Sequence, residues 1–384
     1  MGKTHFEHFF RPTMARIDLK ALTHNYDALK NLLPEGVEIM AMVKADAYGH
    51  GAVEVSRALE QLGVKALGVA TVEEGLELRS SGIETRILVM GGLMGVGSAA
   101  ACVMVGADLT PVIHSADVIG ALETAAREKK KKLPIHVKVD TGMNRLGIRI
   151  ESLPNLLSRI KSSENLVVEG VMTHFAQAGH NSFTDEQIDL FKKAKVKIES
   201  ELGKIRLWHM ANSTALIERL ISFSDMDEIW VRPGLSLYGT VSDAKVPDGV
   251  KLIPVMSLVS KVALIKHVPK GERVSYGSTF EVKKNSLLAV VPIGYADGYP
   301  WALSNKAKVL IEGMRVPVVG RVTMDMIIVD VTDLSGKVEV GSEVILMGRQ
   351  KDASITVDEI ASWANTIPYE IFCGISKRMP RIYI

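Results

Sequence analysis

The sequence predicts a (β/α)8 barrel of the TIM type, followed by a mostly β C-terminal domain. The first observation is a regular alternation of short apolar runs with amphipathic stretches over about the first 245 of the 384 residues, which is typical of βα units. The second is a change beyond residue 245, where long β-rich runs take over. We therefore expect a barrel domain over residues 1–245 and a β-rich domain over residues 246–384.

Each of the eight predicted barrel strands is a short apolar run that ends in small or polar residues. The runs span residues 39–45, 66–70, 86–91, 107–113, 135–140, 167–175, 207–213 and 228–234. Helical stretches lie between them, the clearest at residues 51–63, 71–82, 115–132 and 184–203 and the weakest at the Gly- and Ala-rich residues 96–106. Because crossovers between parallel strands are right-handed, eight units in series predict a closed barrel. An open doubly wound sheet is the alternative.

The second domain is predicted from its long β-rich runs, which cover residues 251–268, 286–298 and 308–332. Only one convincing helix accompanies them, at residues 357–365. The segment 240–250 contains Pro, Gly and Asp, which are typical of a linker. It is the natural boundary between the two domains.

The composition favours a protein that acts on a small molecule. Lys and Arg number 46 against 44 Asp and Glu, so the formal charge of +2 favours neither a nucleic-acid partner nor a membrane anchor. The only cysteines, Cys102 and Cys373, form no CxxC pair, so we expect no metal and a reducing compartment. The first 13 residues lack the apolar stretch of a signal peptide, and no apolar run is long enough to span a bilayer. We expect a cytoplasmic protein.

The first candidate for chemistry is Lys44, at the C-terminal end of the first predicted strand. Barrel enzymes build their active sites at this end of the barrel. Burial among apolar neighbours favours the neutral amine of a lysine, which both Schiff-base formation and proton abstraction require. For an isolated lysine, however, the better interpretation is a side chain that extends its amine to solvent from a strand edge.

Other polar residues fall at the same ends of later strands, which changes that interpretation. They are Arg145 after the fifth strand, His174 at the end of the sixth, Ser213 after the seventh and Arg232 at the end of the eighth. Alone, each has an ordinary explanation: a loop cation, a core histidine or, for Ser213, a helix N-cap. Together, the loops after the seventh and eighth strands commonly form a phosphate site, and residues 212–214 and 232–235 suit that role.

The resemblance to a family becomes specific in eight segments that occur in order along nearly the whole chain. They are residues 43–51, 138–147, 211–213, 232–239, 274–280, 292–300, 320–326 and 373–381. These segments resemble the signature segments of alanine racemases, which are pyridoxal-phosphate enzymes of fold type III. The resemblance implies interconversion of L- and D-alanine, supplying D-alanine for cell-wall peptidoglycan. It also implies a homodimer with shared active sites, and a strand near residues 14–19 that joins the second domain's sheet.

The resemblance implies two opposed catalytic residues. Lys44 would bind the cofactor as a Schiff base and exchange a proton on the D-alanine face, and Tyr276, supplied by the partner subunit, would serve the L-alanine face. Two groups make physical sense because the planar carbanion loses and regains its proton on opposite faces. A tyrosine base also requires cationic neighbours, since phenols ordinarily ionise near pH 10.

The resemblance also assigns the binding residues. Arg232 would face the pyridine nitrogen, and His174 would orient Arg232. Arg145 would contact the cofactor's phenolic oxygen and the substrate carboxylate. The phosphate would be held by Tyr48, Ser213, Gly234 and Tyr369. The substrate carboxylate would also bind the backbone N–H of Met324, with Tyr295 and Asp325 at the entrance.

Two further positions stand out against the family. Thr323 occupies a position where relatives commonly carry Cys or Ser, and its extra methyl group is expected to narrow substrate choice. Lys138 corresponds to a lysine that is carbamylated in some relatives and positions the neighbouring arginine. A barrel-interior lysine paired with a carboxylate is an equal alternative for Lys138.

Three rival functions share parts of this pattern. An amino-acid decarboxylase of related architecture would need a cysteine-bearing catalytic loop, and the only cysteine of the second domain, Cys373, lies in a different segment. A non-catalytic pyridoxal-phosphate carrier would be a single short barrel, whereas this chain has a second domain of roughly 140 residues that holds Tyr276. A broad-spectrum racemase would typically be exported.

Overall fold

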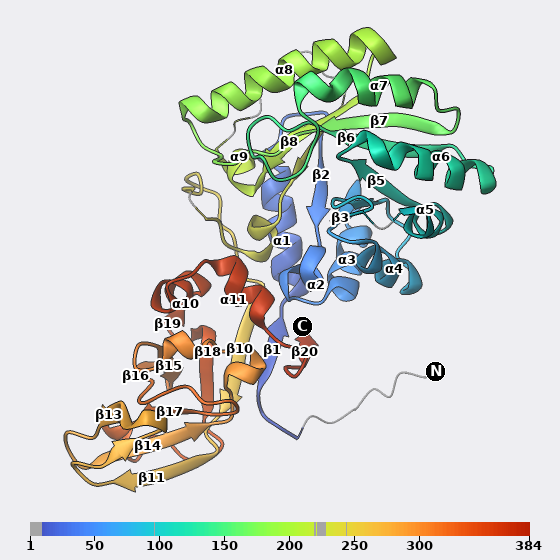
Figure 1. The fold of residues 1–384 in the computed structure, drawn as a ribbon. Coiled ribbons are helices and arrows are strands. Elements are labelled where there is room, and N and C mark those ends of the chain that lie inside the picture. Colours follow the sequence, from blue (N-terminus) through green and yellow to red (C-terminus); the bar gives the residue numbers. More distant parts are fainter. Residues whose placement is uncertain (1–9, 96, 219, 221–227, 243) are drawn as a thin grey trace. The chain divides into compact units, whose positions relative to one another are not determined.

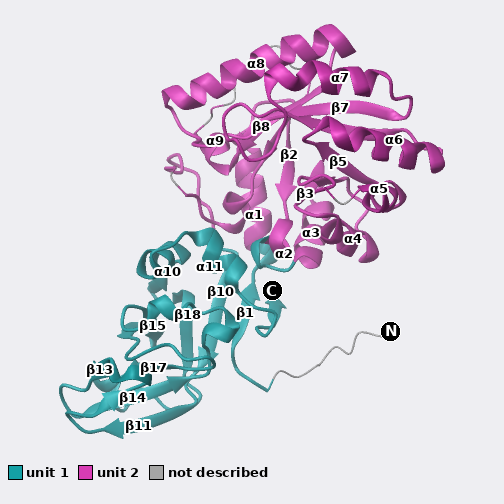
Figure 2. Ribbon diagram, viewed as in Figure 1, with its two compact units in different colours: residues 1–20, 48–51, 254–384 teal, residues 21–47, 52–253 magenta. Residues whose placement is uncertain are grey.

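The structure, a computed structural model, describes residues 10–384 except 96, 219, 221–227 and 243 (Figure 1). It divides into two compact units (Figure 2). The barrel unit comprises residues 21–47 and 52–253, and the β unit comprises residues 1–20, 48–51 and 254–384. Most of the N-terminal stretch in which we predicted no signal peptide, residues 1–9, lies outside the described residues. Over the described part of the chain, no helix combines the length and apolar character needed to cross a membrane.

The barrel unit contains a closed barrel of eight parallel strands. They are β2 (Val37–Met42), β3 (Ala66–Val69), β4 (Ile87–Val89), β5 (Leu109–Ile113), β6 (Leu133–Lys138), β7 (Leu166–Met172), β8 (Leu207–Asn212) and β9 (Glu228–Arg232). The ring closes where β2 pairs with β9 in parallel, with Val37 opposite Ile229. The predicted barrel is therefore confirmed, and the alternative prediction of an open doubly wound sheet is wrong.

One helix precedes the first barrel strand and others lie between the strands. They are α1 (Leu19–Lys30), α3 (Ala52–Gln61), α4 (Val72–Ser80), α5 (Gly97–Gly106), α6 (Ile119–Glu128), α7 (Leu153–Lys161), α8 (Ser182–Leu202) and α9 (Ser213–Ile217). Of these, α4, α8 and α9 begin at a side-chain cap. Helix α8 starts at Asn181, whose side chain accepts the backbone N–H of Thr184, a regular N-cap. Even the weakly patterned α5 forms, because Ala101, Met104 and Val105 are buried along one side.

The β unit is built from three sheets. The largest has the order β16-β15-β18-β10-β1-β20, with β19 on β18; the others are β11-β14-β17 and β12-β13. Their bounds are β1 (Met14–Ile17), β10 (Met256–Lys261), β11 (Leu264–Val268), β12 (Arg273–Val274), β13 (Phe280–Glu281), β14 (Ser286–Val291), β15 (Lys308–Ile311), β16 (Met314–Pro317), β17 (Ile327–Asp330), β18 (Glu343–Gln350), β19 (Ala353–Ile355) and β20 (Arg381–Tyr383). The N-terminal β1 lies between β10 and β20, so the two ends of the chain share one sheet.

The described part of the β unit has two helices of its own where one was predicted, α10 (Val357–Ala364) and α11 (Pro368–Gly374). Only α10 was predicted from the sequence. In the structure it begins with a capping box of Thr356 and Glu359, a recognisable start signal. Helix α11 has seven residues and no side-chain cap, too little for a periodic pattern. Its burial of Ile371 and Phe372 stabilises it through tertiary packing instead.

Candidate active site

Lys44 lies two residues beyond β2, at the start of a left-handed turn, α2 (Lys44–Tyr48). The φ angles of residues 45–48 are 53°, 55°, 52° and 53°. Left-handed backbone costs about 1–2 kcal/mol for each residue that carries a Cβ, so this turn persists only where other contacts hold it. Lys44 thus lies at the predicted end of the strand, whereas the left-handed turn was not predicted from the sequence.

Arg232, the last residue of β9, is buried with only 3% of its surface exposed. Its Nη2 donates to the carbonyls of Thr173 (2.7 Å) and Met210 (3.1 Å) and lies 3.2 Å from Nδ1 of His174. Because a guanidinium is only a donor, Nδ1 of His174 accepts this bond and the ring proton is on Nε2. Burial first, and then the charge of Arg232, hold the pKa of His174 well below its usual value. The imidazole is therefore neutral.

Lys138 ends β6 and is also buried, at 5% exposure. Burial, followed by the charges of Arg232 and Arg145, lowers the pKa of its amine to about 8. Asp140 is the carboxylate whose charge acts on Lys138, and it raises the pKa of the amine against the larger effect of burial. The alternative of a barrel-interior lysine paired with a carboxylate therefore stays open. Arg145 lies in the loop after β6, an exposed segment shaped by Asp140, whose Oδ1 accepts the N–H of Gly142 at 3.1 Å.

Ser213 follows β8, and its hydroxyl connects the ends of β8 and β9. Oγ accepts the backbone N–H of Gly234 (2.9 Å) and of Ser236 (3.3 Å). The N-cap of α9 is Asn212, whose side chain accepts the N–H of Ala215 at 3.0 Å. The interpretation of Ser213 as that N-cap is therefore wrong, because the cap is one residue earlier and the hydroxyl of Ser213 faces the loop after β9 instead.

The remaining predicted residues belong to the β unit. Tyr48 and Tyr369 are in contact there, with ring centroids 5.9 Å apart, and burial raises the pKa of Tyr48. Tyr276 begins the short 3₁₀ turn η4 (Tyr276–Ser278) and is 73% exposed. Gly277 has φ 70° and faces the guanidinium of Arg321, whose Cζ is 3.0 Å from the position of a Cβ on Gly277. A cation thus lies beside the turn that carries Tyr276.

Arg321 was not singled out from the sequence, although it lies in one of the signature segments. Its guanidinium stacks over the ring of Trp301 at 5.5 Å, a cation–π contact, and its carbonyl accepts the hydroxyl of Ser275 at 2.7 Å. Only the folded chain brings residues 275–277 beside residue 321, so no local motif could have identified this neighbour.

The two predicted entrance segments are joined through their backbones. The N–H of Tyr295 donates to the carbonyl of Thr323, and the N–H of Ala296 donates to that of Met324, both at 3.0 Å. Gly294 permits this close approach, because a Cβ there would collide with the carbonyl oxygens of Thr323 and Met324. Tyr295, Met324 and Asp325 are therefore presented by one interlocked pair of loops in the β unit.

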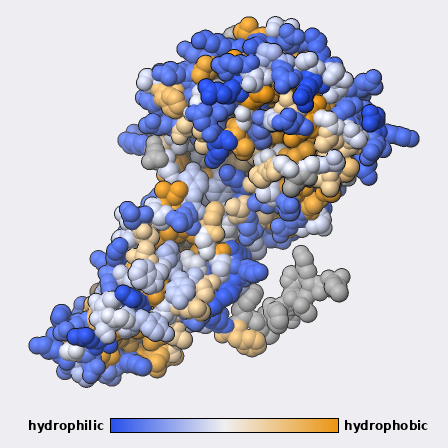
Figure 3. Space-filling view, in the orientation of Figure 1, coloured by the Kyte–Doolittle hydropathy of each residue, from blue (hydrophilic) through white to orange (hydrophobic). Residues whose placement is uncertain are grey.

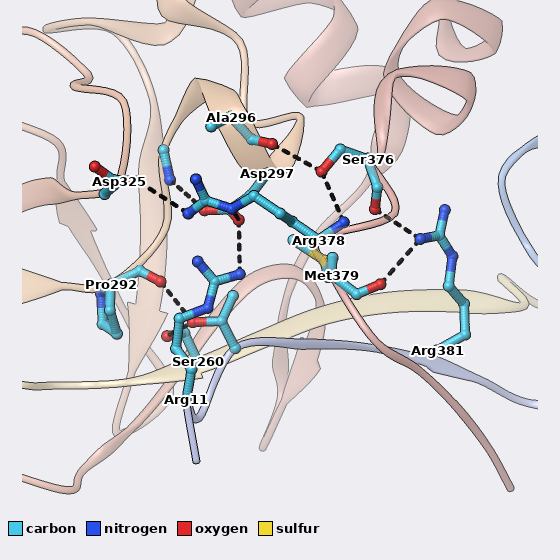
Figure 4. A network of polar contacts seen from close by, with 12 residues as sticks. Arg11, Ser260, Pro292, Ala296, Asp297, Asp325, Ser376, Arg378, Met379 and Arg381 are labelled. Atoms are coloured by element: carbon cyan, nitrogen blue, oxygen red, sulfur yellow. Dashed lines mark hydrogen bonds and ion pairs between the residues drawn. The ribbon is translucent and has the colours of Figure 1, made fainter. Parts of the chain in front are cut away.

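A buried carboxylate, Asp297, anchors this pair of loops (Figure 4). Its Oδ1 accepts Nη2 of Arg11 at 2.6 Å and lies 3.1 Å from Nε of Arg378, while Oδ2 accepts the N–H of Gly294 at 3.0 Å. Arg378 also donates from Nη2 to Asp325 at 2.9 Å. Asp297 and Arg378 were missed from the sequence, because their partners are distant along the chain.

The structure therefore gathers the predicted residues into two groups, one in each unit. The barrel unit holds Lys44, Lys138, Arg145, His174, Ser213, Arg232 and Gly234 around the C-terminal ends of its strands. The β unit holds Tyr48, Tyr276, Tyr295, Met324, Asp325 and Tyr369. The barrel group combines buried cations with backbone donors, which suits an anionic ligand.

Comparison with known proteins gives consistent matches along the whole chain. Residues 17–242 match the family model of the alanine racemase N-terminal domain, and residues 255–383 match that of the C-terminal domain. The alanine racemase of Geobacter sulfurreducens is 42% identical over 380 residues, covering 97% of both chains. The structure of alanine racemase from D-cycloserine-producing Streptomyces lavendulae matches with a TM-score of 0.90 at 33% identity, covering 98% of both chains. The alanine racemase of Bartonella henselae with covalently bound pyridoxal phosphate matches with a TM-score of 0.82 at 32% identity, covering 97% of this chain and 99% of that one.

Proposed function

This chain belongs to the alanine racemase family, a family of isomerases, and from this premise we propose that it interconverts L-alanine and D-alanine with pyridoxal phosphate as cofactor. The observation that carries the proposal is the buried Arg232 at the end of β9, among the other polar groups at that end of the barrel. D-alanine for peptidoglycan is the proposed product in the cell. A cytoplasmic location fits Cys102 and Cys373, which form no disulfide in the described part of the chain.

The barrel residues fit the cofactor on their own evidence. Nη1 of Arg232 is buried, and no acceptor among the described residues receives its hydrogen bond. A buried donor without a partner costs about 1–3 kcal/mol, so this N–H calls for an acceptor such as a pyridine nitrogen. Burial lowers the pKa of Arg232 to about 9, and the group is still a cation at neutral pH. A donor at that position keeps the pyridine nitrogen unprotonated.

The other cofactor contacts follow from the same group of residues. His174, held neutral, keeps Arg232 oriented through Nδ1. Ser213 and the backbone N–H of Gly234 would hold the phosphate, with Tyr48 and Tyr369 contributing their hydroxyls. Arg145 would contact the phenolic oxygen and, together with the backbone N–H of Met324, the substrate carboxylate. When bound, pyridoxal phosphate withdraws electrons from the substrate's Cα and makes its hydrogen acidic.

Two residues on opposite faces of the substrate would then transfer the proton. Lys44 holds the cofactor and takes or returns the Cα proton on the D-alanine face. The hydroxyl of Tyr276 does the same on the L-alanine face, with the cation Arg321 beside its turn to favour the phenolate. By leaving the pyridine nitrogen unprotonated, Arg232 would make the bound cofactor a weaker electron sink and so disfavour transamination and elimination.

We propose that Tyr276 comes from the partner subunit of a homodimer. Several large apolar side chains of the β unit are exposed to solvent. Their exposed fractions are 73% for Tyr276, 54% for Trp301, 52% for Met324 and 49% for Met326. Figure 3 shows one face of the molecule, on which hydrophobic patches interrupt a mostly hydrophilic surface. Exposed apolar groups near residues with assigned roles are typical of an interface. Each site would combine Lys44 and the barrel residues of one subunit with Tyr276 of the other, with Tyr295 and Asp325 at the entrance.

We also propose that Lys138 is carbamylated. The neutral amine is the form that adds to carbon dioxide, and the lowered pKa of about 8 makes that form available near neutral pH. Carbamylation would replace a cation by an anion beside Arg145 and Arg232, and the new carboxylate could accept hydrogen bonds from Arg145.

Carbon-13 NMR of the protein with labelled bicarbonate should show a carbamate signal that is absent in Lys138→Ala. Its occupancy should rise between pH 6.5 and 8.5, because the neutral fraction rises as pH passes the lowered pKa. Lys65→Ala, which changes a lysine before β3, should keep the signal. A signal that persists in Lys138→Ala would contradict the assignment.

The test of the proposed function is incubation of the purified protein with L-alanine and pyridoxal phosphate in deuterated water. D-alanine carrying deuterium at Cα is expected, together with the absorbance of covalently bound cofactor. Bound cofactor with release of carbon dioxide would favour a decarboxylase, and bound cofactor without any reaction would favour a carrier. Absence of bound cofactor would rule out the cofactor assignment. Comparison with larger amino acids would show how far Thr323 narrows substrate choice.

A further inference from the structure

The left-handed turn after Lys44 requires contacts that hold it, and one carboxylate in the barrel unit supplies the first of them. Glu74, in the first turn of α4, accepts the backbone N–H of Ala45 through Oε1 at 2.7 Å. Its other oxygen, Oε2, accepts the N–H of Ala70 at 2.6 Å and that of Thr71 at 3.4 Å. Ala45 is the residue directly after Lys44, and Ala70 directly follows β3.

These bonds connect the ends of two neighbouring strands. Strands β2 and β3 pair in parallel, with Met42 opposite Gly68. Beyond the end of this pairing, the carboxylate of Glu74 bridges the two chains by accepting the N–H of Ala45 and the N–H of Ala70. The far end of the turn has its own anchor, since Oδ1 of Asp46 accepts the N–H of Ala52 at 2.7 Å. The bonds made by Glu74 and Asp46 together restrain the backbone that follows Lys44.

We propose that Glu74 is a positioning residue for Lys44, which it serves through the amide of Ala45. This inference rests on the proposed role of Lys44 in holding the cofactor. A charge-assisted bond to a backbone N–H is stronger than a neutral one, so the carboxylate is well suited to keeping a strained turn in place. If the bond is lost, the turn can relax, and the amine of Lys44 no longer meets the cofactor in one orientation.

Helix capping alone does not account for the contact to Ala45. Glu74 also forms a capping box with Thr71 at the start of α4. The chain contains a second such box at α10, where Glu359 accepts the N–H of Thr356 and otherwise pairs with Arg315. A capping box therefore does not require its glutamate to bond the backbone after a neighbouring strand. The bond from Glu74 to the N–H of Ala45 is additional to capping.

Two variants separate positioning from capping. Gln can replace Glu in a capping box, but it has one acceptor oxygen, and its amide NH2 would face a second N–H donor. If its one oxygen stays on the amides of Ala70 and Thr71, Glu74→Gln should keep the cap of α4 and the melting temperature while releasing the N–H of Ala45. Thr71→Ala removes the cap hydroxyl and leaves the carboxylate of Glu74 in place, so it should lower the melting temperature without disturbing Lys44.

The experiment uses the full-length protein, stripped of cofactor and titrated with pyridoxal phosphate, with amide hydrogen exchange measured on the cofactor-free form. Glu74→Gln is expected to weaken cofactor affinity about tenfold or more and to accelerate exchange at Ala45, an exposed residue. Thr71→Ala is expected to leave affinity within about twofold of the original. Glu74→Gln should also lower kcat more than it raises KM for alanine, because the substrate's own contacts are unchanged.

Either of two results would overturn the inference: wild-type affinity and Ala45 exchange in Glu74→Gln, or an equal loss of affinity in Thr71→Ala. Failure of the proposed function has a different signature, since the unaltered protein would then neither bind pyridoxal phosphate nor racemise alanine. In that case, the exchange rate at Ala45 in Glu74→Gln still decides whether the carboxylate holds the turn.

Discussion

Replacement of Lys44 by alanine is expected to abolish covalent cofactor binding and to lower kcat for racemisation by about 10³-fold or more. The physical reason is that one amine holds the cofactor and exchanges the proton on the D-alanine face, so its loss removes both contributions together. Absorbance of the purified variant, and the rate of deuterium incorporation into D-alanine, measure the two losses separately.

Two controls distinguish lost chemistry from lost folding in Lys44→Ala. Lys65→Ala changes a lysine before β3, at the opposite end of the barrel from Lys44, and should keep full activity. Added small primary amines should partly restore exchange on the D-alanine face, because they can enter the space that the lysine side chain vacated. Covalent cofactor binding that persists in Lys44→Ala would show that another residue holds it.

Replacement of Tyr276 by phenylalanine is expected to keep bound cofactor and to lower racemisation by about 10²–10⁴-fold, the usual contribution of a positioned acid or base. Only the L-alanine face should be affected. In deuterated water, D-alanine should still exchange its Cα hydrogen without inversion, whereas L-alanine should not exchange. Exchange of L-alanine at the original rate would contradict the assignment.

The matched control for Tyr276→Phe is Tyr299→Phe. Tyr299 lies in the same unit, is buried, and has a hydroxyl that finds no partner among the described residues. Removal of that hydroxyl should leave exchange on both faces unchanged, so any effect in Tyr276→Phe can be attributed to the position and not to the loss of a phenol.

Mixed dimers of the two inactive variants test whether Tyr276 comes from the partner subunit. A dimer of one Lys44→Ala and one Tyr276→Phe subunit would contain one site with both residues intact and one site with neither. Random re-association of equal amounts should then restore about a quarter of the original activity. No recovery in verified mixed dimers would place Lys44 and Tyr276 in sites formed by a single chain.

The barrel could be predicted because its signal is local. Each barrel strand is covered on both faces, so it appears as a short apolar run, and each helix between strands has its own apolar spacing. Residues at strand ends, such as Lys44 and Arg232, could be assigned to one end of the barrel because all parallel strands point the same way. Helix α11 was missed because a seven-residue helix has no repeat long enough to detect.

Contacts between distant residues could not be predicted from the chain. Asp297 meets Arg11 and Arg378 from positions 286 and 81 residues away, and nothing local in the sequence marks it as a buried anchor. Arg321 beside the turn of Tyr276 is a case of the same kind. A resemblance can name such residues only if their role in relatives is already recognised.

The sequence by itself therefore determined the alternation of elements, the residues at the strand ends and, through the ordered signature segments, the family. The tertiary structure alone decided the states of those residues: the neutral form of His174, the lowered pKa of Lys138 and the left-handed backbone beyond Lys44. The reason is that protonation and backbone strain depend on burial and on charges brought close by folding. These are properties of neighbours in space, and the order of residues along the chain does not display them.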